Sequence, residues 1–191
     1  MSIDPSAFRA VLGRYATGVT IVTTRTADGR PSGLTVNSFT SVSLDPPLVL
    51  FCLDRAAGSG PAFAESDCFA VNILAAGQAS ISARFADPVA ARFVNEGTII
   101  WETGAPILND ALAALDCRVH ARHDGGDHII LVGRVLRAEV LREAPPLVYW
   151  RGNYQGLAWP DRRPTGIRSL PRRWRWFPVT GRSSRVPRTA T

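Results

Sequence analysis

The segment of this 191-residue chain whose residue types best suit ligand binding runs from Gly33 to Ser41 and leads to Pro46-Pro47. It consists mainly of small polar and β-branched side chains. Threonine, valine and phenylalanine favour extended strands, whose side chains alternate between two faces. Hydroxyls and free backbone N–H groups along such a strand edge can hold a planar, phosphate-bearing ligand. An ordinary hairpin strand with a solvated face would show the same residue types.

A second candidate site is the loop from Asp54 to Ser59, which follows an apolar run. A strand, a loop of small residues and a helix start bring unpaired N–H groups together, and that arrangement suits a phosphate. A simple surface connection stays open as the alternative. A dinucleotide-binding fingerprint does not fit, because Phe63 occupies the position of its third glycine.

Short strands must position these residues, since most of the chain shows β-type patterns separated by turns. We predict one N-terminal helix, capped by Asp4, whose stripe of Phe8, Val11, Leu12 and Tyr15 packs over a barrel end. Residues 54–66 are expected to form a loop and short helix, residues 77–85 a small helix, and residues 86–109 irregular structure. Many short strands with few helices favour an antiparallel barrel. The expected strands are 18–24, the returning polar segment, 48–53, 68–74, 115–122, 128–141 and 147–150. The continuously apolar strands 48–53 and 68–74 are each expected to be buried on both faces.

Charge is unevenly distributed along the chain. The net charge is +6, but residues 160–191 hold nine arginines and one acid, whereas residues 1–159 have a net charge of −2. We predict that the Arg/Pro-rich tail is disordered. Its tryptophans among arginines suggest a nucleic-acid-binding module as one alternative function, which the slightly acidic body disfavours.

The three cysteines, Cys52, Cys68 and Cys117, lack the pairing of a disulfide framework and the spacing of a metal site. We expect buried thiols, no metal ion and a cytoplasmic location. No apolar run approaches the roughly 20 residues of a membrane span, and no secretion signal is evident.

The polar segment and the run Ser-Leu-Asp-Pro-Pro-Leu-Val at residues 43–49 resemble the signature of the flavin reductase family. The resemblance extends from about Phe8 to Tyr154. It implies an FMN-binding split β-barrel, a Greek-key antiparallel barrel with a few short helices, over residues 1–159. Residues 160–191 depart from what the family carries after its closing turn.

The resemblance also implies roles for individual residues. The isoalloxazine ring is lined chiefly by backbone groups, with a ribityl or ring contact nearby, and the flavin phosphate is held in the loop after the buried strand. A Gly-Asp-His motif brings its histidine beside flavin and nicotinamide, so His128 is the implied catalytic residue that orients the reductant. His120 and His123 have no such match and are expected to be exposed. The implied cofactor-binding residues are Thr35, Val36, Asn37, Ser38, Ser41, Asp54, Arg55, Ser59, Arg84, Phe85 and Tyr154.

Some positions depart from the family pattern. Asn37 replaces a serine or glutamine, and Ala57 stands where many relatives have a hydroxyl. For Arg84 and Phe85, an amphipathic helix with one packed aromatic is the structural alternative, and a surface histidine is the alternative for His128.

The activity implied is hydride transfer from NADH or NADPH to FMN or FAD, with the reduced flavin supplied to a separate monooxygenase that acts on aromatic compounds. The resemblance further implies a homodimer with each flavin near the subunit interface, and no membrane association. A flavin-binding carrier or redox sensor without turnover is the main alternative.

Overall fold

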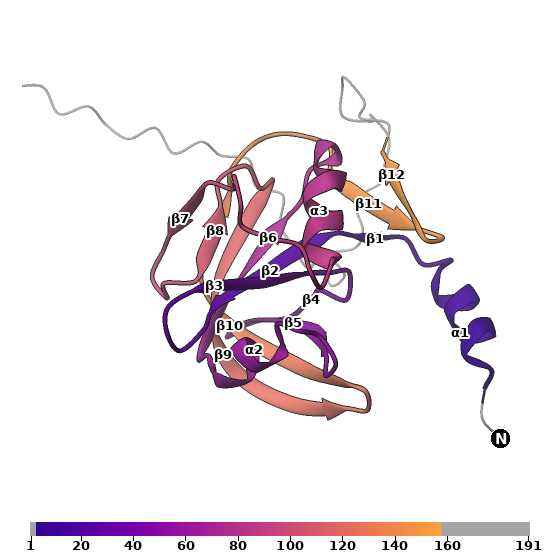
Figure 1. The fold of residues 1–191 in the computed structure, drawn as a ribbon, viewed down its shortest axis with the longest axis horizontal. Coiled ribbons are helices and arrows are strands. Elements are labelled where there is room, and N and C mark those ends of the chain that lie inside the picture. The colour runs from indigo at the N-terminus through magenta and orange to yellow at the C-terminus, as the bar shows by residue number, and fades with distance from the viewer. Residues whose placement is uncertain (1–2, 158–191) are drawn as a thin grey trace, which may run out of the picture. The chain divides into compact units, whose positions relative to one another are not determined.

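Residues 3–157 are described by the computed structural model, and they form a mainly antiparallel β structure (Figure 1). Its largest sheet contains β2 (Thr20–Arg25), β3 (Pro31–Val36), β4 (Thr40–Leu44), β5 (Pro47–Asp54), β6 (Cys68–Ile73), β9 (Ala113–Gly125) and β10 (His128–Val140). The strand order is β3-β2-β6-β9-β10-β5-β4. Although β3 and β4 are consecutive in the chain, they are the two edges of this sheet. The predicted split antiparallel barrel is therefore confirmed.

The remaining elements are short. They are α1 (Pro5–Leu12), β1 (Thr17–Gly18), α2 (Gly60–Glu65), the 3₁₀ turn η1 (Ala76–Gln78), α3 (Ala79–Ala86), β7 (Thr98–Ile100), β8 (Pro106–Leu108), β11 (Leu147–Trp150) and β12 (Asn153–Gly156). β1, β11 and β12 form a small sheet, and β7 pairs with β8. The prediction of irregular structure over residues 86–109 was wrong for β7 and β8, because three-residue strands are too short to show alternation.

Two hairpins confirm the strands expected from the sequence. In the first, Thr20 of β2 pairs with Val36 of β3, and the connecting turn contains Gly29 at φ +80°. In the second, the long strands β9 and β10 meet at a turn in which Gly126 has φ +78°. Both glycines occupy the left-handed region, where a side chain would be strained.

The barrel core is built on three phenylalanines. The Phe51 ring of β5 meets the rings of Phe63 and Phe69 edge to face, with centroids 5.7 Å and 5.1 Å away. Gly133 of β10 makes room for this cluster, since a Cβ atom there would lie 2.3 Å from Phe69 Cζ. The prediction that β5 is buried on both faces was wrong, because its inward residues are buried whereas the alternate ones are only half-buried.

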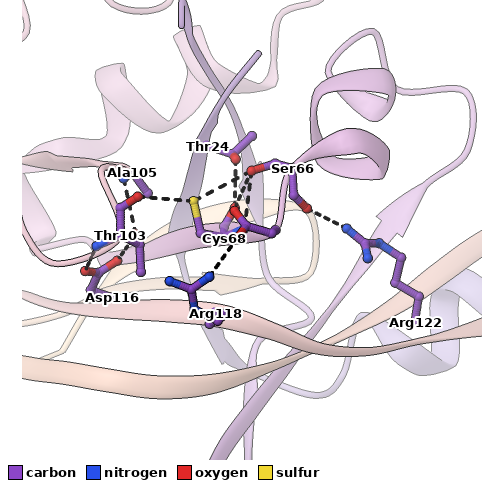
Figure 2. A network of polar contacts seen from close by, with 9 residues as sticks. Thr24, Ser66, Cys68, Thr103, Ala105, Asp116, Arg118 and Arg122 are labelled. Atoms are coloured by element: carbon purple, nitrogen blue, oxygen red, sulfur yellow. Dashed lines mark hydrogen bonds and ion pairs between the residues drawn. The ribbon is translucent and has the colours of Figure 1, made fainter. Parts of the chain in front are cut away.

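A buried polar network fixes the loop between β7 and β8 onto β9 (Figure 2). Asp116 is fully buried, and its carboxylate accepts hydrogen bonds from the backbone N–H of Thr103 at 2.9 Å and from the Thr103 hydroxyl. The thiol of Cys68 donates to the Thr103 carbonyl at 3.6 Å. These bonds compensate the burial of the carboxylate, and the loop is thereby held in one position.

α1 departs from its predicted packing. Asp4 caps the helix as predicted, accepting from the Ala7 N–H at 2.9 Å. None of its residues is buried, however, and Phe8, Val11, Leu12 and the following Tyr15 expose between 48% and 77% of their surface. In Figure 1 the helix stands at the right of the view, apart from the seven-stranded sheet. The apolar stripe therefore lacks a partner among the described residues of one subunit.

Other expectations can be checked directly. Cys68 and Cys117 are buried thiols as predicted, whereas Cys52 is only partly buried. His120 and His123 are exposed, as predicted. Among the described residues, no helix has the length and apolar character needed to cross a bilayer. The prediction of a disordered tail at residues 160–191 lies outside the described residues.

Candidate functional site

The polar face of β3 and the inner face of α3 enclose a pocket of about 330 Å³. We call it the ring pocket. Its walls come from four parts of the chain, and two of its residues belong to the predicted polar segment. The residues that line it are Val19, Thr35, Asn37, Ser82, Ala86, Tyr149 and Tyr154.

Two hydrogen bonds set the shape of the ring pocket. The hydroxyl of Thr35 donates to the Ser82 carbonyl at 2.6 Å, which ties β3 to α3. The Ser82 and Tyr154 hydroxyls lie 2.9 Å apart, which ties α3 to β12. Ser82 is fully buried, so this contact satisfies a hydroxyl that has no access to water. Ser82 is not among the residues that the sequence resemblance implies, so the structure adds it to the site.

Other residues of the polar segment hold the barrel together. The Ser38 hydroxyl accepts from the Cys52 N–H at 2.9 Å and donates to the Cys52 carbonyl at 3.3 Å, so it joins the chain after β3 to β5. Val36 is buried, and its carbonyl accepts from Thr20. Ser41 is exposed on the edge strand β4. The side chains of Val36 and Ser38 thus face the protein, which agrees with a ligand contact through backbone groups.

Two of the predicted cofactor-binding arginines already have carboxylate partners. Arg55 donates from Nη2 to the Asp124 carboxylate at 2.5 Å and from Nε to the Gly126 carbonyl at 3.0 Å. Arg84 forms an ion pair with Glu96. Phe85 is fully buried and packs edge to face on Phe93, with centroids 5.0 Å apart. Its side chain belongs to the core beneath α3.

A second pocket, of about 260 Å³, lies between the start of β3, the loop before α2 and the segment after α3. We call it the Ser59 pocket. Ser59 is 4% exposed, and its hydroxyl has no hydrogen-bond partner among the described residues. Arg92 also lines this pocket. Sequence reasoning missed Arg92, because the segment that carries it shows neither periodicity nor a motif.

His128 stands at the start of β10, paired across the sheet with Asp54 of β5. Its Nδ1 atom lies 2.6 Å from the Asp127 carboxylate, so Nε2 is left for other partners. The hydrogen bond and the charge of His128 both hold the pKa of Asp127 below its ordinary value. An adjacent carboxylate of this kind orients the imidazole ring.

The predicted site residues fall into separate groups within one subunit. In Figure 1 the β9–β10 turn, next to which His128 lies, is at the bottom of the view, whereas α3 and β12 of the ring pocket are at the top. The ring pocket is lined by neither His128 nor Arg55. A single subunit therefore brings Thr35, Asn37 and Tyr154 together but leaves His128 apart from them.

Two further features of the surface bear on the site. Within residues 3–157, no three His, Cys, Asp or Glu side chains cluster closely enough to bind a metal ion.

A larger groove, of about 570 Å³, crosses β9 and β10 beside Arg118, His120 and Arg134, but it contains none of the predicted site residues. Size alone therefore does not locate the site in this molecule.

Comparison with known proteins supplies an independent finding. Residues 12–158 match the family described as "Flavin reductase like domain". The chain is 42% identical, over 91% of its own length and 85% of the relative's, to the reductase subunit HsaB of a flavin-dependent monooxygenase from Rhodococcus jostii. It is 46% identical, over 77% of its length and 83% of the relative's, to the FMN reductase (NADH) SmoA of Agrobacterium fabrum.

A solved structure agrees with these sequence matches. The NADH:FAD oxidoreductase of Streptomyces globisporus C-1027, solved in complex with NAD and FAD fragments, superimposes with a TM-score of 0.77 at 36% identity. The match covers 85% of this chain and 99% of that one.

Proposed function

The chain belongs to the flavin reductase like domain family, and from this premise we propose that it is an NAD(P)H:flavin oxidoreductase. It transfers a hydride from NADH or NADPH to FMN or FAD, and supplies the reduced flavin to a separate monooxygenase component. The observation that carries this proposal is that the family match spans both pockets and every strand of the barrel. Relatives with NADH-dependent flavin reduction in their names support the choice of reaction.

The reaction needs no nucleophile from the protein. When bound, the flavin takes up the hydride of the reduced nicotinamide together with a proton, and the oxidised nicotinamide leaves. The protein contributes position, because the two rings must stack with the reacting atoms roughly 3 to 3.5 Å apart. The absence of a catalytic triad or a carboxylate pair from the predicted site is therefore compatible with turnover.

The residues on β3 suit a flavin ring. Thr35 and Asn37 present polar groups to the ring pocket, while Tyr149 and Tyr154 supply aromatic surface at its other wall. Because β3 is an edge of the seven-stranded sheet, no other strand of that sheet pairs with its outward side. We propose that the ring lies against this edge, as the sequence resemblance implies.

A homodimer completes the site in this proposal. One subunit separates His128 from the ring pocket, and the ring pocket alone is at the lower end of the 300–1,000 Å³ range of ligand pockets. The apolar stripe of α1 has no partner among residues 3–157 of the same chain. A second copy of the chain that packs on α1 would account for both the uncovered stripe and the separation of His128 from the ring pocket. Each subunit could then contribute its His128 to the ring pocket of the other.

Mixed dimers test this arrangement. A His128→Ala chain and a Tyr154→Ala chain, each poorly active alone, are co-expressed with different affinity tags, and the mixed species is purified. If the site takes one residue from each subunit, one of the two sites in the mixed dimer is intact and activity returns. A mixed dimer as inactive as its parents, or a monomeric wild-type protein, contradicts the arrangement.

In this proposal the reduced flavin is released and used by a separate oxygenase. HsaB is named as the reductase subunit of a flavin-dependent monooxygenase, and BorF as the flavin reductase component of a bacterial two-component tryptophan halogenase. We propose the same role here, with an oxygenase that acts on an aromatic ring and with both proteins in the cytoplasm. Residues 1–159 carry the activity in this proposal, so a chain that ends at Trp159 should reduce flavin as fast as the full chain.

Steady-state turnover separates this function from its alternative. Purified protein at a low concentration is mixed with excess free FMN or FAD and with NADH or NADPH, and nicotinamide oxidation is followed. An enzyme oxidises many equivalents per subunit. A flavin carrier or redox sensor binds the flavin but stops at one equivalent.

A further inference from the structure

We propose that Arg92, together with Ser59, binds the phosphate of the flavin, and that Arg55 does not. This inference rests on the proposed function and names a residue that sequence reasoning did not select. The chemistry involved is recognition of a phosphate ester by one guanidinium and one hydroxyl in the Ser59 pocket. Arg55 instead fixes the β9–β10 turn beside His128.

The Ser59 hydroxyl provides the first observation. It is buried with its residue at 4% exposure, lines the Ser59 pocket and has no hydrogen-bond partner among the described residues. Buried hydroxyls are nearly always paired, because an unpaired one loses its bonds to water without replacement. A ligand oxygen in the pocket supplies the missing partner.

Arg92 provides the second observation. Its guanidinium donates from Nη1 to the Gly33 carbonyl at 2.7 Å, and from Nε and Nη2 to the Asp87 carbonyl at 3.2 Å and 3.0 Å. These bonds hold the group in place but do not neutralise it, since carbonyls carry no net charge. Two of the five N–H groups of an arginine remain for a ligand.

The other two arginines near the predicted site, unlike Arg92, each have a carboxylate partner. Arg55 is paired with Asp124 and Arg84 with Glu96, whereas no carboxylate within residues 3–157 forms an ion pair with Arg92. An arginine that already faces a carboxylate attracts a phosphate weakly, because the carboxylate repels the anion. Arg92 therefore has the positive charge that the phosphate needs.

Both pockets lie along one strand, which suits a single ligand. Gly33 lines the Ser59 pocket and Thr35 lines the ring pocket, and residues two apart on a strand share a face. Their separation along β3 is about 7 Å, so a ribityl arm can join a ring in one pocket to a phosphate in the other. Gly58 also lines the Ser59 pocket.

Comparison of FMN with riboflavin isolates the phosphate, because the two ligands share the ring and the ribityl arm. Affinities are measured by flavin fluorescence titration for the wild type and for Arg92→Gln, Arg92→Lys and Ser59→Ala. We expect the wild type to prefer FMN, and Arg92→Gln to lower that preference about tenfold or more while riboflavin affinity stays within about twofold. Arg92→Lys should keep part of the preference, because it keeps the charge.

Ser59→Ala tests the same phosphate site with a variant that is expected to fold normally, in case the Arg92 variants do not. Ser59 makes no side-chain hydrogen bond to the described protein, so its removal should leave unfolding unchanged and still weaken FMN severalfold relative to riboflavin. The matched control is Arg118→Gln, an exposed arginine paired with Asp67 at 2.8 Å outside both pockets.

Several results would overturn the inference. One is an Arg92→Gln protein that keeps the wild-type preference for FMN, and another is loss of that preference in Arg55→Gln instead. A change confined to the KM of NADPH, with NADH unaffected, would assign the phosphate to the nicotinamide and not to the flavin. A wild type that binds both flavins equally refutes the role of Arg92 but leaves the reductase proposal standing. A wild type that binds neither overturns both.

Discussion

Tyr154→Phe removes one oxygen atom from the wall of the ring pocket, and its effect can be worked out from the structure. The lost hydroxyl lies 2.9 Å from that of Ser82, which is fully buried on α3. In the variant, the Ser82 hydroxyl has neither a protein partner at that position nor access to water. Such an unpaired buried group costs about 1–3 kcal/mol of the free energy of unfolding.

Ser82→Ala should cost less than Tyr154→Phe. Tyr154 is 37% exposed, so its hydroxyl can turn to water when the serine is removed. The expected loss is then about 0.5–1.5 kcal/mol, the net value of one hydrogen bond. In the double variant neither hydroxyl remains, and the total loss should fall short of the sum of the two single losses by about 1 kcal/mol.

Urea unfolding measures all four proteins at one fixed protein concentration, because the stability of the proposed dimer would depend on concentration. Flavin titrations run in parallel, and both single variants should bind FMN less tightly since β12 is no longer tied to α3. Additive losses in the double variant would refute the reasoning, because they would show that the two hydroxyls do not interact in solution.

Three further predictions concern the site and the core. His128→Ala should slow hydride transfer by on the order of 10- to 100-fold with flavin affinity little changed, and stopped-flow reduction with an unaltered rate would remove this residue from the mechanism. Gly133→Ala should lower the free energy of unfolding by about 1–3 kcal/mol, because the new Cβ would lie 2.3 Å from Phe69 Cζ, and denaturant unfolding measures this. Burial, and secondarily the charge of Asp116, raise the pKa of Cys117, so only the unfolded chain loses this proton as pH rises past the ordinary 9.0. Stability should therefore fall above that pH, and less steeply in Cys117→Ala; identical pH profiles of urea unfolding would contradict the assignment.

Local patterns were sufficient for much of the barrel. The β2–β3 and β9–β10 hairpins were predicted because alternating strands flank turns with glycine, and Gly29 and Gly126 do adopt positive φ. Asp4 was identified as a helix cap because capping depends on residues three apart. Features that depend on residues close together in the sequence can thus be predicted without a structure.

Features that depend on contacts between residues far apart in the sequence could not be predicted. Arg55 and Arg84 form ion pairs with Asp124 and Glu96, and no local spacing in the sequence predicts either pair. The same holds for Arg92, which is placed by carbonyls of Gly33 and Asp87.

The α1 stripe has the pattern of a packed helix, yet nothing within residues 3–157 covers it. A helical pattern predicts that an apolar face is covered but not what covers it.

The central claim is catalytic turnover of free flavin, and anaerobic stoichiometry tests it most directly. Protein is mixed without oxygen with a large excess of FMN or FAD and of NADH, and both the bleaching of oxidised flavin and the loss of NADH are recorded. We expect one flavin to be reduced for each NADH consumed, and the reaction to continue until many flavins per protein chain are bleached. Bleaching that stops at one flavin per subunit, or NADH that is not consumed at all, would contradict it.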